Sequence, residues 1–142
     1  MKMNFSVNDI IKIHDDGIEM YGGIYGIRNK NEIDSVISNV YATFDGQELY
    51  PSTVDKASFL SYGLIKGHAF LDGNKRVGVA TMMIYLKMNG YELNVTNEEL
   101  IDFGLKIATS QYNQQNIASW IEKHKTNKLL ITFNPKYDFA MD

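Results

Sequence analysis

Nine consecutive residues, 68–76, carry the most reactive combination of side chains in this sequence, and they read HAFLDGNKR. A histidine, which titrates near neutrality, is followed by a carboxylate, a glycine, an amide and two cations. An apolar segment with helical spacing comes next, over residues 77–88. The order predicts a base just before a helix N-terminus and cations in its first turn. Because helix N-termini bind phosphate, the run indicates phosphoryl or nucleotidyl transfer.

Each polar residue of this run suits one part of such a reaction. His68 can take a proton from a hydroxyl that attacks phosphorus, although a lone histidine is more often a core or helix-end residue. Asp72 is the only carboxylate in the run. It is the candidate Mg²⁺ ligand, and it can also serve as a plain helix N-cap. The candidate phosphate-binding residues are Gly73, Asn74, Lys75 and Arg76. Gly73 allows close approach of the backbone, Asn74 offers a side-chain amide, Lys75 a point charge and Arg76 a planar guanidinium.

The whole chain limits the classes of function. It has 142 residues, 44% of them hydrophobic, a net charge of −3 and no cysteine. This composition predicts a compact soluble cytoplasmic domain without disulfides, with neither a signal peptide nor a membrane span. An acidic balance argues against nucleic acid as a direct partner, although a local cationic pocket remains compatible with it. We expect a domain over residues 1–126, followed by a tail, 127–142, that adds a strand or binds a partner.

Apolar spacing and cap signals predict a mainly helical protein. Ser6 with Asp9, Pro51-Ser52 with Asp55, and Thr96 with Glu99 have the residue types of helix starts. Asn31 is the expected N-cap of another helix, and Gly90 is an expected helix stop. The predicted helices cover residues 7–21, 31–40, 52–67, 77–89, 97–107 and 116–123. The apolar run at 129–133 is the part of the tail that favours a strand.

Between the second and third predicted helices, residues 41–50 favour a short hairpin. Asp45-Gly46 between β-prone residues is a strong signal for a two-residue turn. A helical turn running on through Tyr41 to Thr43 is the competing interpretation. An exposed strand edge can in general pair with an extended segment of another chain by strand addition.

The run at 68–76 resembles the signature of the Fic/Doc family, and Lys75 places it nearer the death-on-curing (Doc) toxins than the Fic adenylyltransferases. The segment 11–26, with its His14-Asp15 pair, also resembles the N-terminal part of Doc proteins. The resemblance covers residues 5 to about 125. It implies an all-α helical bundle with a small β-hairpin flap before the motif helix. His14 and His124 themselves are expected to be structural or surface groups.

The resemblance also implies a reaction. In Doc toxins, the lysine that corresponds to Lys75 accompanies transfer of the γ-phosphoryl of ATP to a protein hydroxyl. The target of that class is a threonine of translation elongation factor Tu. His68 would then be the base, Asp72 the Mg²⁺ ligand, and residues 73–76 the nucleotide-binding residues. Gly73 instead resembles the Fic form and keeps adenylyl transfer (AMPylation) open as the alternative.

Two further expectations concern partners and the competing class of function. The pattern of the self-inhibitory helix found in some Fic proteins has no match here, since Lys123 stands where that pattern needs glutamate. The resemblance therefore implies a separate antitoxin, as in type II toxin–antitoxin modules. A non-catalytic binding module is the remaining alternative, and it would require a damaged site. Every position of this site is filled.

Overall fold

The computed structural model describes residues 5–127, which form six helices and two small sheets. The prediction of an all-α fold with a small hairpin is confirmed. In chain order the helices are α1 (Val7–Tyr21), α2 (Lys30–Val40), α3 (Thr53–Gly67), α4 (Asn74–Met88), α5 (Asn97–Ala108) and α6 (Gln114–His124). None of the helices in this described part is both long and apolar enough to cross a bilayer.

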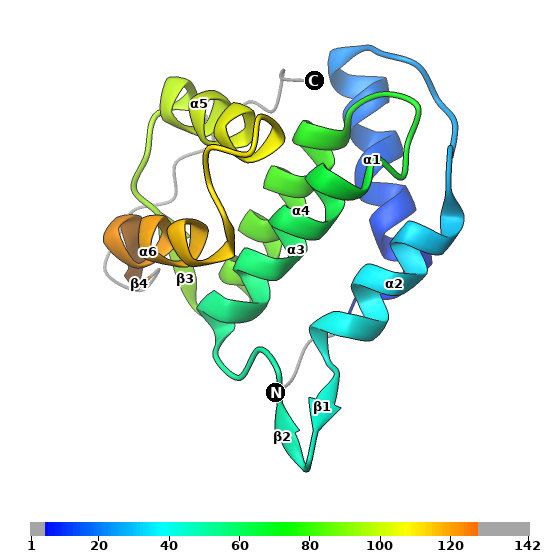
Figure 1. The fold of residues 1–142 in the computed structure, drawn as a ribbon. Helices are drawn as coiled ribbons and strands as arrows, with labels where there is room; N and C mark the ends of the chain where they lie inside the picture. Colours follow the sequence, from blue (N-terminus) through cyan, green and yellow to red (C-terminus); the bar gives the residue numbers. More distant parts are fainter. Residues whose placement is uncertain (1–4, 128–142) are drawn as a thin grey trace.

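Helices α3 and α4 form the centre of the molecule (Figure 1). α1 packs on α4 and α2 packs on α3, while α5 and α6 cover the opposite side. α4 is buried around most of its circumference, as expected for a helix enclosed by neighbours. The largest fully buried side chains come from α1 to α5 and from the segments between them, and they include Ile10, Ile33, Leu60, Phe70, Met82, Leu93, Phe103 and Ile107.

The predicted helix starts are mostly confirmed, because they depend on local hydrogen bonds. Capping boxes join Ser6 to Asp9, Ser52 to Asp55 and Thr96 to Glu99. The prediction of Asn31 as the cap of α2 is wrong. Asn29 is the N-cap, and its side chain accepts from the N–H of Asn31.

Two other boundaries also differ from those expected. α4 begins at Asn74 rather than at 77, because Gly73 already adopts the cap conformation and the 77 N–H bonds to the Gly73 carbonyl. α6 begins at Gln114, where Asn113 and Asn116 form a reciprocal box that the sequence pattern did not reveal.

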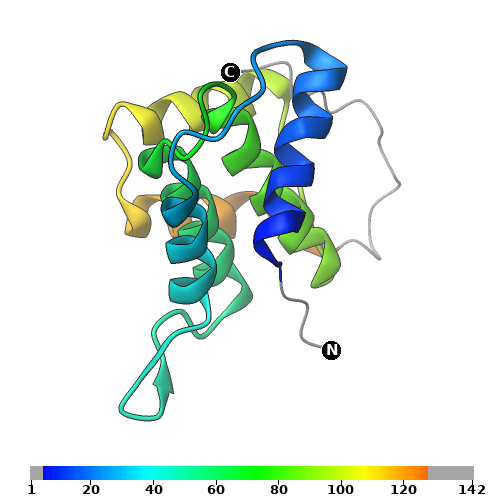
Figure 2. The same cartoon turned by 90° about the vertical axis from the view of Figure 1, so that its right-hand side faces the viewer.

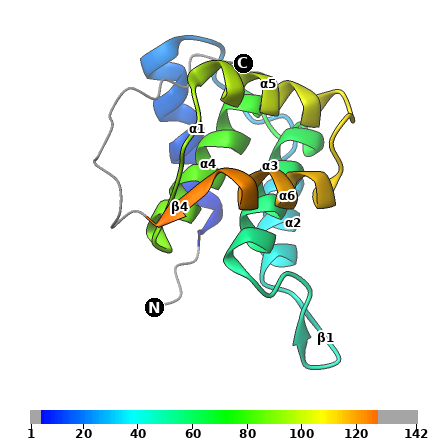
Figure 3. The same cartoon turned by 90° about the vertical axis from the view of Figure 1, so that its left-hand side faces the viewer.

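The hairpin consists of β1 (Thr43–Phe44) and β2 (Gln47–Glu48), and it projects from the helical body in all three views (Figures 1, 2 and 3). Asp45 and Gly46 both have left-handed backbone, with φ of 53° and 79°, as a two-residue turn of this kind requires. The helical alternative is wrong, because Tyr41 ends α2.

The hairpin and the 68–76 run lie at opposite ends of α3 (Figure 1). The hairpin leads into the first turn of α3, and His68 follows its last turn. A helix of 15 residues spans about 22 Å. A partner held at the hairpin therefore has to extend along α3 to reach His68.

A second sheet was not predicted. β3 (Tyr91–Leu93) pairs antiparallel with β4 (Lys125–Asn127), which ties the connection after α4 to the end of α6. The pairing crosses the expected boundary between residues 126 and 127. The apolar run at 129–133 lies outside the described residues.

Candidate functional site

His68 is exposed at the C-terminal end of α3, and its backbone is left-handed, with φ 48° and ψ 49°. This conformation costs a non-glycine residue roughly 1 kcal/mol, so neighbouring contacts must hold it. The next carbonyl, that of Ala69, accepts from the N–H groups of Arg28 and Asn29 at 2.7 and 3.0 Å. The backbone after His68 is thus fixed against the start of α2, while the imidazole faces solvent.

The loop after His68 is also clamped from within. Asn74, which is 8% exposed, accepts from the N–H of Phe70 at 3.1 Å and donates to the Phe70 carbonyl at 3.0 Å. Its amide oxygen and one N–H therefore hold the loop. Asn74 was predicted to contact phosphate, and in this structure its amide is turned towards the main chain of the loop.

Asp72 is half-buried, and both of its carboxylate oxygens accept backbone N–H bonds. Oδ2 accepts from Ile24 at 3.0 Å and Oδ1 from Gly73 at 2.9 Å. These bonds fix the orientation of the carboxylate. A carboxylate has about four lone-pair directions, so two hydrogen bonds leave room for a cation. The simple N-cap interpretation is wrong, because Gly73 is the N-cap of α4.

Gly73 has a φ of 81°, which is the left-handed region that favours glycine. A cap residue without a side chain brings the positive end of the α4 dipole close to any anion in front of it. A Cβ built on Gly73 would lie 3.4 Å from Nε2 of His14 and 3.5 Å from Ile18 Cδ1, which is ordinary contact. The backbone conformation, rather than lack of space, is thus what glycine provides here.

The two cations occupy the first turn of α4, as predicted, but their surroundings differ. Lys75 is half-buried, whereas Arg76 is 8% exposed. Nη1 of Arg76 donates to the Gly22 carbonyl at 3.0 Å, and the guanidinium lies over the Tyr21 ring, 5.6 Å from its centre. One of its five N–H donors is therefore used to join α4 to the end of α1.

His14 lies behind the loop and contacts two of its residues, Phe70 and Asp72. Its side chain is 1% exposed, and its ring stacks on Phe70 with centres 3.8 Å apart and an angle of 5°. Nε2 is 2.7 Å from the carbonyl oxygen of Asp72, and Nδ1 is 2.9 Å from Oδ1 of Asp15. Both oxygens accept only, so both contacts are hydrogen bonds when each ring nitrogen carries a proton.

Helix α1 and residues 22–26 together form a wall behind the loop, which we call the α1 wall. A Cβ on Gly17 would lie 2.8 Å from Arg76 Cδ, one on Gly23 would lie 2.8 Å from Asp72 Oδ2, and one on Gly26 would lie 2.5 Å from Leu71 Cδ1. The glycines of this segment thus allow backbone and loop to approach closely. The local sequence of this segment does not indicate a role for it, because its partners lie 48 to 58 residues away.

The donor set suits a cation that arrives with a nucleotide. Among residues 5–127 there is no group of three or more His, Asp or Glu side chains that could hold a metal by themselves. Mg²⁺ commonly binds through one or two carboxylates together with phosphate oxygens and waters. Asp72, with its orientation fixed, fits that pattern.

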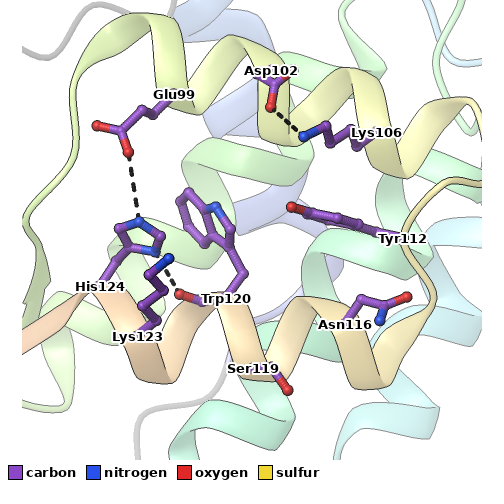
Figure 4. A pocket seen from close by; sticks show the side chains of 9 residues that line it. All are labelled: Glu99, Asp102, Lys106, Tyr112, Asn116, Ser119, Trp120, Lys123 and His124. Atoms are coloured by element: carbon purple, nitrogen blue, oxygen red, sulfur yellow. Dashed lines mark hydrogen bonds and ion pairs between the residues drawn. The ribbon is translucent and has the colours of Figure 1, made fainter.

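Away from the 68–76 run, a hollow of about 440 Å³ lies between α5 and α6 (Figure 4). Four of the side chains that line it form two pairs, Lys106 with Asp102 at 3.0 Å and His124 with Glu99 at 3.6 Å. The N–H of Thr96 holds the pKa of Glu99 below its usual value, and the bond to Asp102 raises the pKa of Lys106. No residue of the 68–76 run lines this hollow.

The site is therefore a helix N-terminus with an exposed histidine, a carboxylate and two cations, on an all-helical scaffold. That combination is typical of proteins that bind phosphate groups. The sequence model of the Fic/DOC family matches residues 4–86. The chain belongs to this family, and the match includes the α1 wall as well as the 68–76 run.

Two relatives place the chain on the Doc side of the family. It is 26% identical over 120 residues to "Protein kinase doc" of Escherichia phage P1, covering 84% of this chain and 94% of that protein. It is 36% identical over 73 residues to "Toxin Doc" of Mycolicibacterium smegmatis, covering 51% of this chain and 56% of that protein. The resemblance found in the sequence is confirmed.

Proposed function

We propose that this chain is a Doc-like toxin that transfers the γ-phosphoryl group of ATP to a hydroxyl of a target protein. The observation that carries the proposal is the position of His68, exposed and held in a left-handed conformation just before the glycine-capped N-terminus of α4. A base and an anion-binding helix end meet there. The names of the two relatives, a protein kinase and a toxin, support the same class.

The proposed reaction assigns each residue a step. The nucleotide phosphates lie at the start of α4, against the Gly73 backbone and the side chains of Lys75 and Arg76, with Asn74 shaping the loop. Asp72 would hold Mg²⁺, which would neutralise part of the negative charge of the phosphates. The target hydroxyl oxygen forms a bond to the γ-phosphorus, and the bond from that phosphorus to the bridging oxygen of ADP breaks. His68 takes the proton of the hydroxyl.

Adenylyl transfer is the second candidate, and Gly73 is the observation that favours it. The surroundings of Gly73 weaken that argument, because an added Cβ would make only ordinary contacts and the cost of alanine would come from φ. Lys75 is the more informative residue. Its side chain charges the space where a glycine would admit the inner phosphates, which favours transfer from the γ-position.

The fold sets the minimum length of a target segment that contacts both the hairpin and His68. A segment that pairs with the hairpin edge and also reaches His68 must extend about 22 Å along α3, roughly seven extended residues. By relationship to Doc, elongation factor Tu is the first target to test. Blocked translation in the cytoplasm would be the outcome, and a separate antitoxin would be the partner that restrains it.

The test uses ATP labelled at either the α- or the γ-phosphorus, with Mg²⁺, purified protein and elongation factor Tu or cell extract. We expect label on a discrete protein from the γ-position alone. His68→Ala should lower the rate by roughly 10²–10⁴-fold, the usual contribution of a general base. His124→Ala is the matched control, because that histidine lines the distant hollow.

The outcomes separate the candidates. Label from the α-position would replace the phosphoryl-transfer proposal with adenylyl transfer. Nucleotide binding without transfer of either label, with toxicity surviving His68→Ala, would support the non-catalytic binding module. Full activity of His68→Ala would contradict the role of His68.

A further inference from the structure

The buried histidine of α1 is the group whose contacts the proposed reaction leaves unexplained. His14 bonds across 58 residues to the Asp72 carbonyl, and its ring lies flat against Phe70. Its other nitrogen is paired with Asp15, which fixes the orientation of the ring. A side chain that is 1% exposed has no access to solvent or to a target. Whatever His14 does is therefore transmitted through the loop.

We propose that His14 is a positioning residue, which fixes the loop between His68 and α4 by donating a hydrogen bond from Nε2 to the Asp72 carbonyl. This inference rests on the proposed function, because it names what holds the reacting groups of that site. It goes further by assigning a task to the α1 wall.

The geometry of the loop shows why this bond matters. The Asp72 carbonyl lies between the carboxylate that would hold the cation and the glycine that caps α4. At 2.7 Å, the contact is short for an N–H···O bond, and it sets the direction of the peptide that joins Asp72 to Gly73. Rotation of that peptide would move the N–H of Gly73, which donates to Oδ1 of Asp72. The histidine thus fixes the carboxylate and the helix cap together.

The stacking on Phe70 acts on the other end of the loop. Phe70 is 1% exposed, and its main-chain N–H and carbonyl both bond to the Asn74 side chain. Its backbone also forms an isolated antiparallel β-bridge with Ile27. The flat contact with His14 fills the space below it. The stacking and the hydrogen bond are separable, because a different substitution removes each.

Two variants separate them. His14→Phe keeps an aromatic ring against Phe70 but cannot donate to the Asp72 carbonyl. His14→Gln loses the ring, but its side-chain amide can place an N–H close to the position of Nε2. The matched controls are His124→Phe and His124→Gln, in a histidine that also packs against an aromatic ring, at a tilt of 36°, and bonds to a carbonyl. Thermal unfolding of all four variants establishes which of them fold.

The first readout is amide hydrogen exchange of the protein without nucleotide, which does not depend on any transfer activity. We expect His14→Phe to speed exchange over residues 68–74 about tenfold, the loss of one strong hydrogen bond, with α5 and α6 unchanged. His14→Gln should stay within about threefold of the parent. Unchanged exchange over 68–74 in a folded His14→Phe protein would overturn the proposal, as would equal loosening by the two variants.

The second readout is the rate of γ-phosphoryl transfer. His14→Phe should lower kcat about tenfold while KM for the target protein stays the same, because the target does not touch His14. His14→Gln should recover most of that rate. If the parent protein transfers no label, the proposed function fails, and the exchange result still decides the role of His14. If His14→Phe does not fold, His14→Gln decides: tenfold faster exchange over 68–74 would overturn the proposal.

Discussion

Two histidines of this protein have similar surroundings and different consequences. His14 stacks on Phe70, and its nitrogens face a carbonyl and a carboxylate. His124 lies against Trp120, with ring centres 4.5 Å apart, and it also faces a carbonyl and a carboxylate. The side chains are 1% and 16% exposed. Residue type and contact type are therefore shared by the two sites.

The difference lies in which segments the contacts join. His124 bonds to the carbonyl four residues earlier in its own helix, so that bond fixes only the histidine. The bond from His14 reaches the carbonyl of the candidate metal ligand, Asp72, 58 residues away in the loop before α4. A buried polar contact thus acquires functional meaning from the element that it holds. Two predictions compare the two regions, a third concerns the α1 wall alone, and a fourth concerns a group outside both regions.

The largest effect is expected from the carboxylates of the two regions. Asp72→Asn should lower the rate of γ-phosphoryl transfer roughly a hundredfold or more, because it removes the negative charge that would hold Mg²⁺. Glu99→Gln, in the hollow between α5 and α6, should leave the rate within about twofold. Initial rates at saturating ATP and Mg²⁺ measure both. An Asp72→Asn protein that keeps more than a tenth of the parent rate would contradict the assignment of this carboxylate.

In the other region we expect a large change in the free energy of unfolding and no change in the rate of transfer. Trp120 stacks on Phe103 with ring centres 4.0 Å apart. Trp120→Ala should lower the free energy of unfolding by about 3 kcal/mol, while folded protein keeps its transfer rate. Urea denaturation measures the change, and exposed Ser119→Ala is the control, with a change within about 0.5 kcal/mol. A slower reaction in folded Trp120→Ala protein would show that the two regions are coupled.

Neighbouring glycines of the α1 wall provide a narrower test. Gly22 and Gly23 have φ of 92° and 125°, so alanine costs about 1 kcal/mol of stability at either position. Only at Gly23 would the new Cβ lie 2.8 Å from Asp72 Oδ2, whereas at Gly22 it would meet nothing within 4 Å. We expect Gly23→Ala to slow transfer about tenfold and Gly22→Ala to have little effect. Equal rates for the two variants would mean that the carboxylate tolerates displacement.

The smallest effect concerns a buried group that belongs to neither region. Burial, together with the charges of Tyr41 and Glu48, raises the pKa of Tyr85 to about 12. The unfolded tyrosine ionises near the ordinary pKa of 10.0, so the contribution of folded Tyr85 to stability is present below pH 10 and is lost between pH 10 and about 12. Tyr85→Phe should therefore flatten the fall in unfolding free energy over that window. Exposed Tyr25→Phe is the control, and an unchanged slope in Tyr85→Phe would contradict the prediction.

Most local features of this fold were predictable from sequence, apart from the box of Asn113 and Asn116 at the start of α6, and distant contacts were not. The three capping boxes and the Asp45-Gly46 turn are set by residues within three or four positions of one another. The starts of α2 and α4 were misplaced, because Asn29 is bonded to Ala69 and Gly73 packs near His14. Both interactions join segments that are far apart in the chain.

The same reason explains what was missed at the site. The residues of the 68–76 run were identified from their types and spacing, and the structure places them around one helix N-terminus. The α1 wall was recognised only as a resemblance, since nothing in its local pattern shows that Ile24 and His14 bond to Asp72. The pairing of β3 with β4 likewise joins residues 91–93 to 125–127.

The short strands of the hairpin have a consequence for the behaviour of the protein at high concentration. Long exposed strand edges let copies of a chain pair with one another and aggregate. β1 and β2 are two residues each, so pairing between copies would form too few hydrogen bonds to persist. Phe44 is nevertheless 71% exposed, which leaves apolar surface at the tip. The hairpin can therefore remain accessible to a larger partner while contributing little to self-assembly.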